Sequence, residues 1–210
     1  MKGKLKLKVC GMRDSKNILE VAALLPEYMG FIFYEKSKRY VGKDFIVPIG
    51  FPAEIKKVGV FVNEKPEKIL ELVARYKLDY VQLHGEEPIV DCKILKGSVK
   101  VIKAFSMDET FDFNFVKPYV PYADLFLFDT KGKNYGGTGL TFDWTLLRKY
   151  SQKTPFFLSG GLSAENISRI VELNDMNLLA VDVNSGAESA VGKKDVMKVK
   201  AIQELLNSFT

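Results

Sequence analysis

Short strand-like apolar runs recur along this 210-residue chain at intervals of roughly 20 to 30 residues, with helix-compatible segments between them. This alternation is typical of successive βα units, whose strands lie side by side in one parallel sheet. Their nearly continuous apolar character predicts strands that are covered on both faces. We expect eight strands, over Leu5–Cys10, Met29–Phe33, Lys57–Val62, Tyr80–Leu83, Lys100–Ala104, Leu125–Phe128, Phe156–Leu158 and Leu179–Val183.

The segments between these runs carry helix-start patterns: Pro66 begins one segment, and Ser163 directly precedes another. The second unit has only a weak helical segment, around Ala53–Lys56. Elsewhere we expect helices over Asp14–Leu25, Pro66–Tyr76, Pro88–Leu95, Phe113–Tyr119, Asp143–Lys149, Ala164–Leu173 and Asp195–Leu206.

No linker or low-complexity stretch divides the chain. Eight βα units therefore predict an α/β fold, a single-domain (β/α)8 TIM barrel with parallel strands over residues 1–210. A doubly wound open sheet is the alternative, although such sheets usually have fewer strands.

Composition narrows the classes of function. No apolar stretch reaches the roughly 18 residues of a membrane span, and the Lys-Leu alternation at the start lacks the apolar core of a secretory leader. We therefore expect a cytoplasmic protein with no membrane association. The 31 basic and 26 acidic residues give a net charge of +5, but lysines mix with acidic residues as on solvated helix faces. This favours a small anionic substrate over a nucleic acid.

Two cysteines and one histidine restrict metal and disulfide chemistry. Cys10 and Cys92 are too few and too far apart in sequence for a disulfide scaffold, and His84 alone gives no metal-binding cluster. We expect neither a metal nor a cofactor. Cys92 lies in a helical pattern and is interpreted as a packing residue.

The chemically distinctive residues follow strands. In a (β/α)8 barrel the loops after the strands build the active site. Cys10 ends the first strand and Asp129 ends the sixth, where the two could move protons onto and off a substrate. Lys8 and Arg13 could favour the thiolate, although Lys8 could point outward. The alternatives are an inert core thiol and a loop-capping carboxylate.

Arg39 follows the second strand and could hold a carboxylate through a two-pronged hydrogen bond. A solvated loop charge is the alternative. His84 follows the fourth strand and could orient a substrate or donate a hydrogen bond, or it could be structural.

Three glycine turns come from the last three units. Glycine lets backbone amides approach an anion closely, and such barrels commonly bind phosphate after strands seven and eight, beside a short extra helix. That helix would here be Ser185–Glu188. Any one turn could be an ordinary one, but together they predict a phosphate ligand. The glycine-turn residues expected to bind it are Gly137, Gly139, Gly160, Gly161, Ser185 and Gly186.

The ordered motifs resemble the phosphoribosylanthranilate isomerases of tryptophan biosynthesis. The resemblance runs from residue 8 to Asp195 and includes Lys8-Val9-Cys10-Gly11-Met12, Ser37-x-Arg39, Val81-Gln82-Leu83-His84-Gly85, Asp129, Gly136-Gly137-Thr138-Gly139, Ser159-Gly160-Gly161 and Asp182-Val183-Asn184-Ser185-Gly186-x-Glu188. Individually these motifs are modest, but their order and spacing are specific.

The resemblance implies a cofactor-free Amadori rearrangement of N-(5-phosphoribosyl)anthranilate. In it, Asp129 would be the general acid that opens the ribose ring, and Cys10 the base that removes the C2 proton. Arg39 would bind the anthranilate carboxylate, the glycine turns would hold the phosphate, and Asp182 would contact the substrate.

The sequence departs from the family pattern at four positions without removing a proposed catalytic group. Lys38 replaces an expected Pro beside Arg39, Ser159 an Ala, Asn184 a Ser and Val191 a Pro.

Two other functions are kept as alternatives. One is another phosphate-binding barrel that acts on a phosphorylated sugar, and the other is a non-catalytic binder of phosphoribosyl ligands. No apolar surface patch is evident from the sequence, so we expect a monomer, with a homodimer as the alternative.

Overall fold

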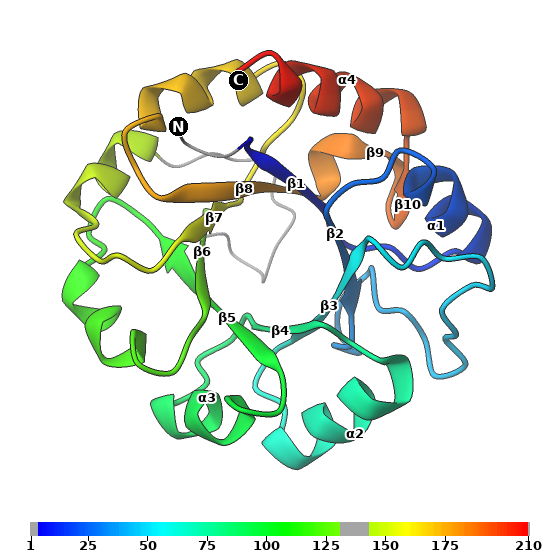
Figure 1. Ribbon diagram of the computed structural model, residues 1–210, viewed down its shortest axis with the longest axis horizontal. Helices are drawn as coiled ribbons and strands as arrows, with labels where there is room; N and C mark the ends of the chain where they lie inside the picture. Colours follow the sequence, from blue (N-terminus) through cyan, green and yellow to red (C-terminus); the bar gives the residue numbers. More distant parts are fainter. Residues whose placement is uncertain (1–3, 131–142, 210) are drawn as a thin grey trace.

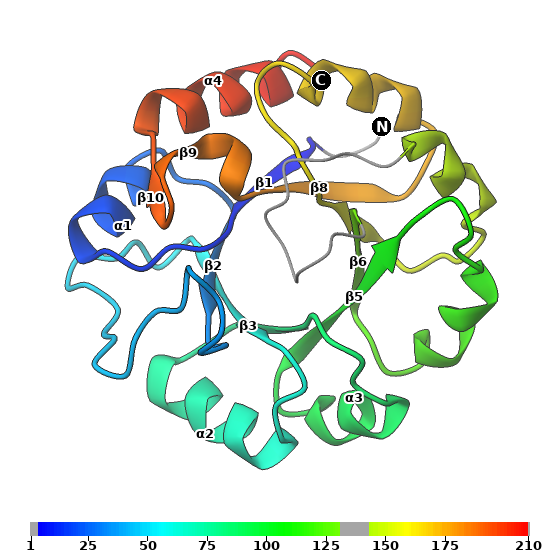
Figure 2. The same ribbon diagram turned by 180° about the vertical axis from the view of Figure 1, so that it is seen from behind.

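The computed structural model describes residues 4–130 and 143–209, which form a closed barrel of eight parallel strands inside a ring of helices (Figure 1). The strands follow chain order around the barrel, and β1 pairs with both β2 and β8. The same closed ring is seen from behind in Figure 2. The predicted (β/α)8 barrel is confirmed. Its strands are β1 (Lys6–Val9), β2 (Tyr28–Ile32), β3 (Lys56–Phe61), β4 (Tyr80–Leu83), β5 (Lys100–Met107), β6 (Leu125–Thr130), β7 (Phe156–Leu158) and β8 (Leu178–Val183).

Regular α-helices cover part of the barrel, and 3-10 helices cover the rest. The α-helices are α1 (Ser15–Ala22), α2 (Pro66–Tyr76), α3 (Ile89–Leu95) and α4 (Val196–Asn207). The 3-10 helices are η1 (Phe113–Phe115), η2 (Lys117–Tyr119), η3 (Trp144–Lys149), η4 (Ile167–Leu173) and η5 (Ser185–Ala187). A two-stranded antiparallel hairpin, β9 (Glu188–Ala190) and β10 (Lys193–Lys194), follows η5.

Helix ends follow from local chemistry. Asp14 caps α1 by accepting from the backbone N–H of Asn17 at 2.8 Å. The predicted extension of α1 to Leu25 is wrong, because Pro26 disfavours helical backbone at the residue before it and Leu25 has a φ of +53°.

The connection from β2 to β3, described throughout, contains no helix, so the expected segment around Ala53–Lys56 is wrong. Pro48 and Pro52 have no N–H to donate to a helical hydrogen bond. The connection packs Phe45 against Phe31 instead, with ring centroids 5.2 Å apart.

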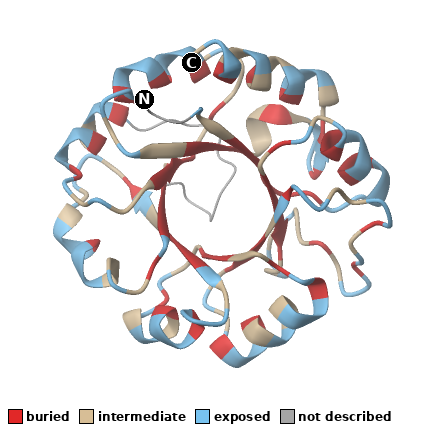
Figure 3. Cartoon of the chain, viewed as in Figure 1, coloured by how far each residue is buried: buried red, intermediate tan, exposed pale blue. Residues whose placement is uncertain are grey.

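Side chains fill the barrel at one end and leave room at the other. One buried cluster comes mostly from the amino-terminal halves of the strands: Tyr28, Val58, Ile102, Ala104, Leu125, Leu127, Phe157 and Ala180. A second core lies between the barrel and its helices. Figure 3 shows the strands buried around the ring and the helices exposed on their outer faces.

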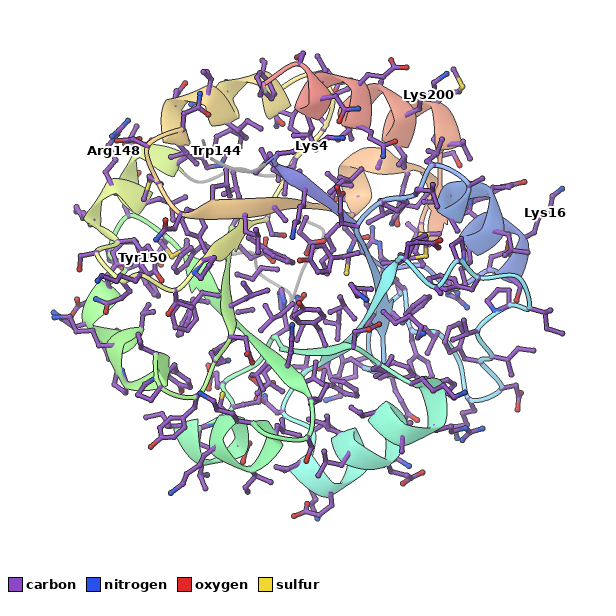
Figure 4. The ribbon with its side chains drawn as sticks, viewed as in Figure 1. Lys4, Lys16, Trp144, Arg148, Tyr150 and Lys200 are labelled. Carbon is purple, nitrogen blue, oxygen red and sulfur yellow. The ribbon has the colours of Figure 1, made fainter. Side chains whose placement is uncertain are left out.

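The outer faces of the helices carry charge. Lys16, Arg148 and Lys200 point away from the barrel (Figure 4), and each side chain is more than half exposed. For Lys200, on the last predicted helix, this confirms the prediction of a solvated helix face. No helix in residues 4–130 or 143–209 is long and apolar enough to cross a membrane.

Candidate active site

A pocket opens at the carboxyl ends of the strands, with an empty volume of about 690 Å³ that includes its open mouth. It brings together residues that are far apart in the sequence. The predicted site residues in its lining are Cys10, Arg39, His84, Asp129, Gly160, Gly161, Asp182, Ser185 and Gly186. The other two predicted glycines, Gly137 and Gly139, lie outside the described residues.

Cys10 extends the first strand into this pocket. Its backbone N–H donates to the carbonyl of Val183 at 2.9 Å, which continues the pairing of β1 with β8. Its side chain packs over Gly30, where an added Cβ would lie only 2.7 Å from the Cys10 Sγ. The residue as a whole is 4% exposed and lines the pocket wall. It is therefore buried and also placed where a bound molecule could meet it.

Burial raises the pKa of the Cys10 thiol above its usual value, and the nearby Asp182 adds to this effect. Lys8 and Lys194 act in the opposite direction. Lys8 is fully buried inside the barrel, so it does not point outward. Arg13, the other expected neighbour, instead donates from Nη1 to the carbonyl of Lys38 at 3.1 Å. Lys8 and Lys194 are thus the cations that most lower the pKa of Cys10, and Arg39 also interacts with it electrostatically.

Asp129 lies near the end of β6, 6% exposed, in register with Ser106 of β5. Its Oδ2 is 3.1 Å from Nε2 of His84. The alternative prediction, that Asp129 caps the following loop, concerns residues outside the described part of the chain.

A line of polar side chains crosses the barrel, and all of its members except Lys8 line the pocket. The buried Lys8 Nζ donates to Oδ2 of Asp182 at 2.8 Å and to Oε1 of Gln82 at 2.8 Å. The Gln82 Nε2 is 2.7 Å from Nδ1 of His84, and His84 meets Asp129 as described above. Burial alone would lower the pKa of Lys8, but Asp182 and Cys10 outweigh it and raise that pKa, so Lys8 stays an ammonium.

One carboxylate oxygen of Asp182 is available as a hydrogen-bond acceptor. Its Oδ2 accepts from Lys8, whereas its Oδ1 is buried and has no hydrogen-bond partner among residues 4–130 and 143–209. Because a buried acceptor without a donor costs free energy, this oxygen is suited to accept from a hydroxyl of a bound molecule.

The backbone around His84 is held from behind by a buried ion pair. Lys103 Nζ donates to Glu87 Oε2 at 2.8 Å, and also to the carbonyls of Leu83 and Gly85 on either side of His84. Glu87 accepts in turn from the backbone N–H of Gly85. Both charged side chains are 3% exposed or less. These contacts fix the strand end that presents His84.

Arg39 lies in the pocket wall despite the Lys38 departure. Its backbone N–H donates to the Ser37 Oγ at 3.1 Å. Its guanidinium donates from Nε and Nη2 to the two oxygens of Glu188, both at 2.7 Å. Lys194 also donates to Glu188, at 2.7 Å. Burial alone would raise the pKa of Glu188, but Arg39 and Lys194 outweigh it and lower that pKa.

Two glycine turns require glycine for steric reasons. Gly160 has a φ of +95°, and a Cβ there would lie 2.2 Å from Oγ1 of Thr130. A Cβ on Gly186 would lie 2.0 Å from the carbonyl of Leu162. The expected short helix is present as η5. Within the described ranges, the backbone N–H groups of Gly160, Gly161, Ser185 and Gly186 have no protein acceptor, which suits an anion.

Local sequence patterns assign no role to four residues of the site. Gln82 and Glu188 lie inside the family motifs, Lys103 lies in the fifth predicted strand, and Lys194 directly precedes the last predicted helix. Only the alternation of side chains along a strand links one of the cations to Cys10 from the sequence. Lys8 lies two residues before Cys10, so the two side chains point to the same face. The partners of these residues lie in other units, beyond the reach of local patterns.

In residues 4–130 and 143–209, no group of three or more His, Cys, Asp or Glu side chains could hold a metal ion. The pocket lining combines a thiol, two carboxyl groups, an imidazole and a guanidinium. Fold and site together define a (β/α)8-barrel enzyme with a small-molecule pocket at the carboxyl ends of its strands.

Residues 7–204 match the sequence profile described as N-(5'phosphoribosyl)anthranilate (PRA) isomerase. A relative of that name from Parabacteroides distasonis is 45% identical over 206 residues, covering 96% of this chain and 93% of the relative. The chain therefore belongs to the N-(5'-phosphoribosyl)anthranilate isomerase family, whose members are isomerases of tryptophan biosynthesis.

Solved structures agree. The crystal structure of the Thermotoga maritima phosphoribosyl anthranilate isomerase has a TM-score of 0.86 and 36% identity, covering 97% of this chain and 99% of that one. Another isomerase structure, with a TM-score of 0.82, 33% identity and the same coverage, is a complex with reduced 1-(o-carboxyphenylamino)-1-deoxyribulose 5-phosphate.

Proposed function

We propose that Asp129 is the general acid and Cys10 the general base in the rearrangement of N-(5'-phosphoribosyl)anthranilate to 1-(2-carboxyphenylamino)-1-deoxyribulose 5-phosphate. The observation that carries this proposal is a buried thiol directly after β1 and a hydrogen-bonded carboxyl on β6 that line one pocket. Two such groups can move protons between substrate atoms without a cofactor.

The reaction needs two proton transfers. Asp129 gives a proton to the ring oxygen of the ribose, the ring C–O bond breaks, and the anthranilate nitrogen lone pair forms a protonated Schiff base. Cys10, whose thiolate form Lys8 and Lys194 favour against the effect of burial, then removes the proton from C2, and the electrons of that C–H bond give an enolamine. Tautomerisation to the ketone completes the isomerisation, so substrate and product have the same atoms.

Three features support the binding mode. The Nη1 group of Arg39 is not used by Glu188, so it can bind the anthranilate carboxylate. The Oδ1 of Asp182, which has no partner in the part of the chain that the structure describes, can accept from a ribose hydroxyl. The backbone N–H groups of Gly160, Gly161, Ser185 and Gly186 can hold the phosphate.

The test follows the decay of anthranilate fluorescence with freshly generated phosphoribosylanthranilate. We expect turnover by the wild type and a loss of at least about 100-fold in kcat for Cys10→Ser and for Asp129→Asn. Cys92→Ala, in the outer core, and Asp175→Asn, on the surface, are the matched controls and should retain activity. An inactive wild type would overturn the assignment, and full activity of either site variant would overturn the role of that residue.

The alternatives remain distinguishable. A barrel that acts on another phosphorylated sugar would turn over that sugar, and a non-catalytic binder would bind phosphoribosylanthranilate without consuming it. Similarity to a 3-hexulose-6-phosphate synthase, at 15% identity and a TM-score of 0.70, concerns the fold alone.

A single domain over residues 1–210, a cytoplasmic location and a monomer, with a homodimer as the alternative, remain predictions. One solved structure is described as mutually generated monomers of the dimeric phosphoribosylanthranilate isomerase of Thermotoga maritima. That protein has thus been obtained both as a dimer and as monomers. Light scattering on the purified chain separates them.

A further inference from the structure

Four side chains form a continuous line of hydrogen bonds that ends at Asp129. Lys8 is joined to Gln82 at 2.8 Å, Gln82 to His84 at 2.7 Å, and His84 to Asp129 at 3.1 Å. Lys8 and Gln82 are at most 1% exposed. Because the line begins at a charged group that can only donate, the direction of every hydrogen bond in it can be worked out.

The contact with Lys8 determines the orientation of the Gln82 side-chain amide. An ammonium is a donor only, so the Gln82 atom 2.8 Å from Lys8 Nζ must be the carbonyl oxygen Oε1. A flipped amide would place two donors face to face. The amide nitrogen Nε2 therefore points to His84, and it donates to Nδ1. Asp182 holds Lys8 from its other side at 2.8 Å.

The contact with Gln82 then determines the tautomer of His84. Since Nδ1 accepts from Gln82, it carries no proton, and the ring proton of the neutral imidazole lies on Nε2. An imidazolium would have a proton on Nδ1 directed at the Gln82 amide N–H, which cannot accept it. His84 therefore faces Asp129 as a neutral donor, and Oδ2 of Asp129 accepts.

We propose that Gln82 is a positioning residue for the general acid: anchored by Lys8, it holds His84 in its neutral Nε2–H tautomer, which fixes Asp129 through Oδ2 and leaves the transferable proton on Oδ1. The part that concerns proton transfer rests on the proposed role of Asp129. Gln82 itself does not need to touch the substrate for this effect.

The sequence offers a direct readout, because His84 is the only histidine among all 210 residues. With ¹⁵N-labelled histidine, the imidazole gives one spin system in an NMR spectrum. We expect Nδ1 of the wild type to resonate as an unprotonated nitrogen and Nε2 as a protonated one at neutral pH. A protonated Nδ1 in the folded wild type would overturn the proposal.

The variant Gln82→Glu reverses the polarity at nearly constant shape. One carboxylate oxygen keeps the contact with Lys8, and the other faces Nδ1 of His84 as an acceptor. We expect a protonated Nδ1 and a kcat at least about tenfold lower, with KM changed by less than about threefold. Gln152→Glu makes the same chemical change next to Ser151, away from the pocket, and should change neither the tautomer nor kcat.

Circular dichroism establishes that the variants fold. If Gln82→Glu does not, Gln82→Met removes the donor without adding charge, and we expect the ring proton to spread over both nitrogens while kcat falls. An unchanged tautomer or an unchanged kcat in the folded variant would contradict the proposal. A wild type with the expected tautomer but no turnover would instead contradict the proposed function and leave the hydrogen-bond assignment intact.

Discussion

Arg39 presents only part of its guanidinium to the pocket. Glu188 accepts from Nε and Nη2, and it is held in turn by Lys194 at 2.7 Å. Arg39 and Glu188 are both largely buried, with side chains 12% and 6% exposed. The contact with Glu188 thus fixes the orientation of the remaining N–H donors of Arg39. A guanidinium that is already oriented loses less conformational entropy when it binds a carboxylate.

Removing the contact between Glu188 and Arg39 should weaken substrate binding more than it slows the chemical step. We expect Glu188→Gln to raise KM roughly tenfold with kcat changed little, because Arg39 loses a bidentate charged partner and becomes free to turn. Steady-state kinetics with phosphoribosylanthranilate measures both constants. Glu204→Gln, which changes an exposed glutamate on α4, is the control. A fall in kcat with constant KM would show that Glu188 acts on the chemical step.

Cys10 and Asp129 stand out in the sequence because each ends an apolar strand, and both line the pocket. The lysines on predicted helix faces are interpreted as solvated, but no local pattern shows that Lys8, Lys103 and Lys194 are each 2% exposed or less. A lysine is buried only when partners compensate its charge. These partners include Asp182, 174 positions from Lys8, which no local pattern can identify.

At the scale of elements, the end of β4 depends on its neighbour β5. Lys103 of β5 reaches past the strand to Glu87, just before α3, and binds the carbonyls on either side of His84. The Asn63 backbone N–H, after β3, also donates to Glu87 at 2.9 Å. This buried pair therefore joins three successive units at the point where they meet the pocket.

Breaking the buried ion pair of Lys103 and Glu87 should destabilise the fold. We expect Lys103→Met to lower the free energy of unfolding by about 3 kcal/mol, because the Glu87 carboxylate stays buried without its cation. Adding Glu87→Gln should recover part of that loss. The exposed pair of Lys68 and Glu71 on α2 is the comparison, and Lys68→Met should cost less than about 1 kcal/mol. Urea denaturation measures all three; equal losses for the two single variants would refute a buried-charge origin.

Strands were easier to predict than helices. All eight predicted strands exist, because buried apolar runs of this length have few alternatives in an α/β fold. The predicted helix over Phe113–Tyr119 instead forms two 3-10 turns, η1 and η2, since Pro118 cannot donate to a helical ladder. Helical spacing alone does not separate α from 3-10 geometry over so few residues.

For the whole molecule, closure of the barrel determines which groups meet. Pairing of β1 with β8 sets Lys8 beside Asp182 in register, and it brings the first and last units to the same pocket. The sequence predicts this closure from eight strands, but not which side chains meet inside the barrel. The fold also buries thiols of different units: Cys10 in the pocket wall, and Cys92 of α3 in the core between the barrel and its helices.

These thiols make the stability of the fold depend on pH in the alkaline range. Burial raises the pKa of Cys92 to about 11, above its value in an unfolded chain. The stabilisation is complete below the unfolded pKa, near about 8.5, and is lost as pH rises towards 11, because the unfolded thiol ionises first.

We expect the stability advantage of wild type over Cys92→Ala, measured by urea denaturation, to shrink by about 3 kcal/mol between pH 8 and 11. Packing lost in the variant does not titrate, so it contributes equally at every pH and cancels from this change. Cys10, whose pKa is also raised, acts in the same direction but is present in both proteins. An advantage that stays constant across this range would show that Cys92 ionises alike in the folded and unfolded chains.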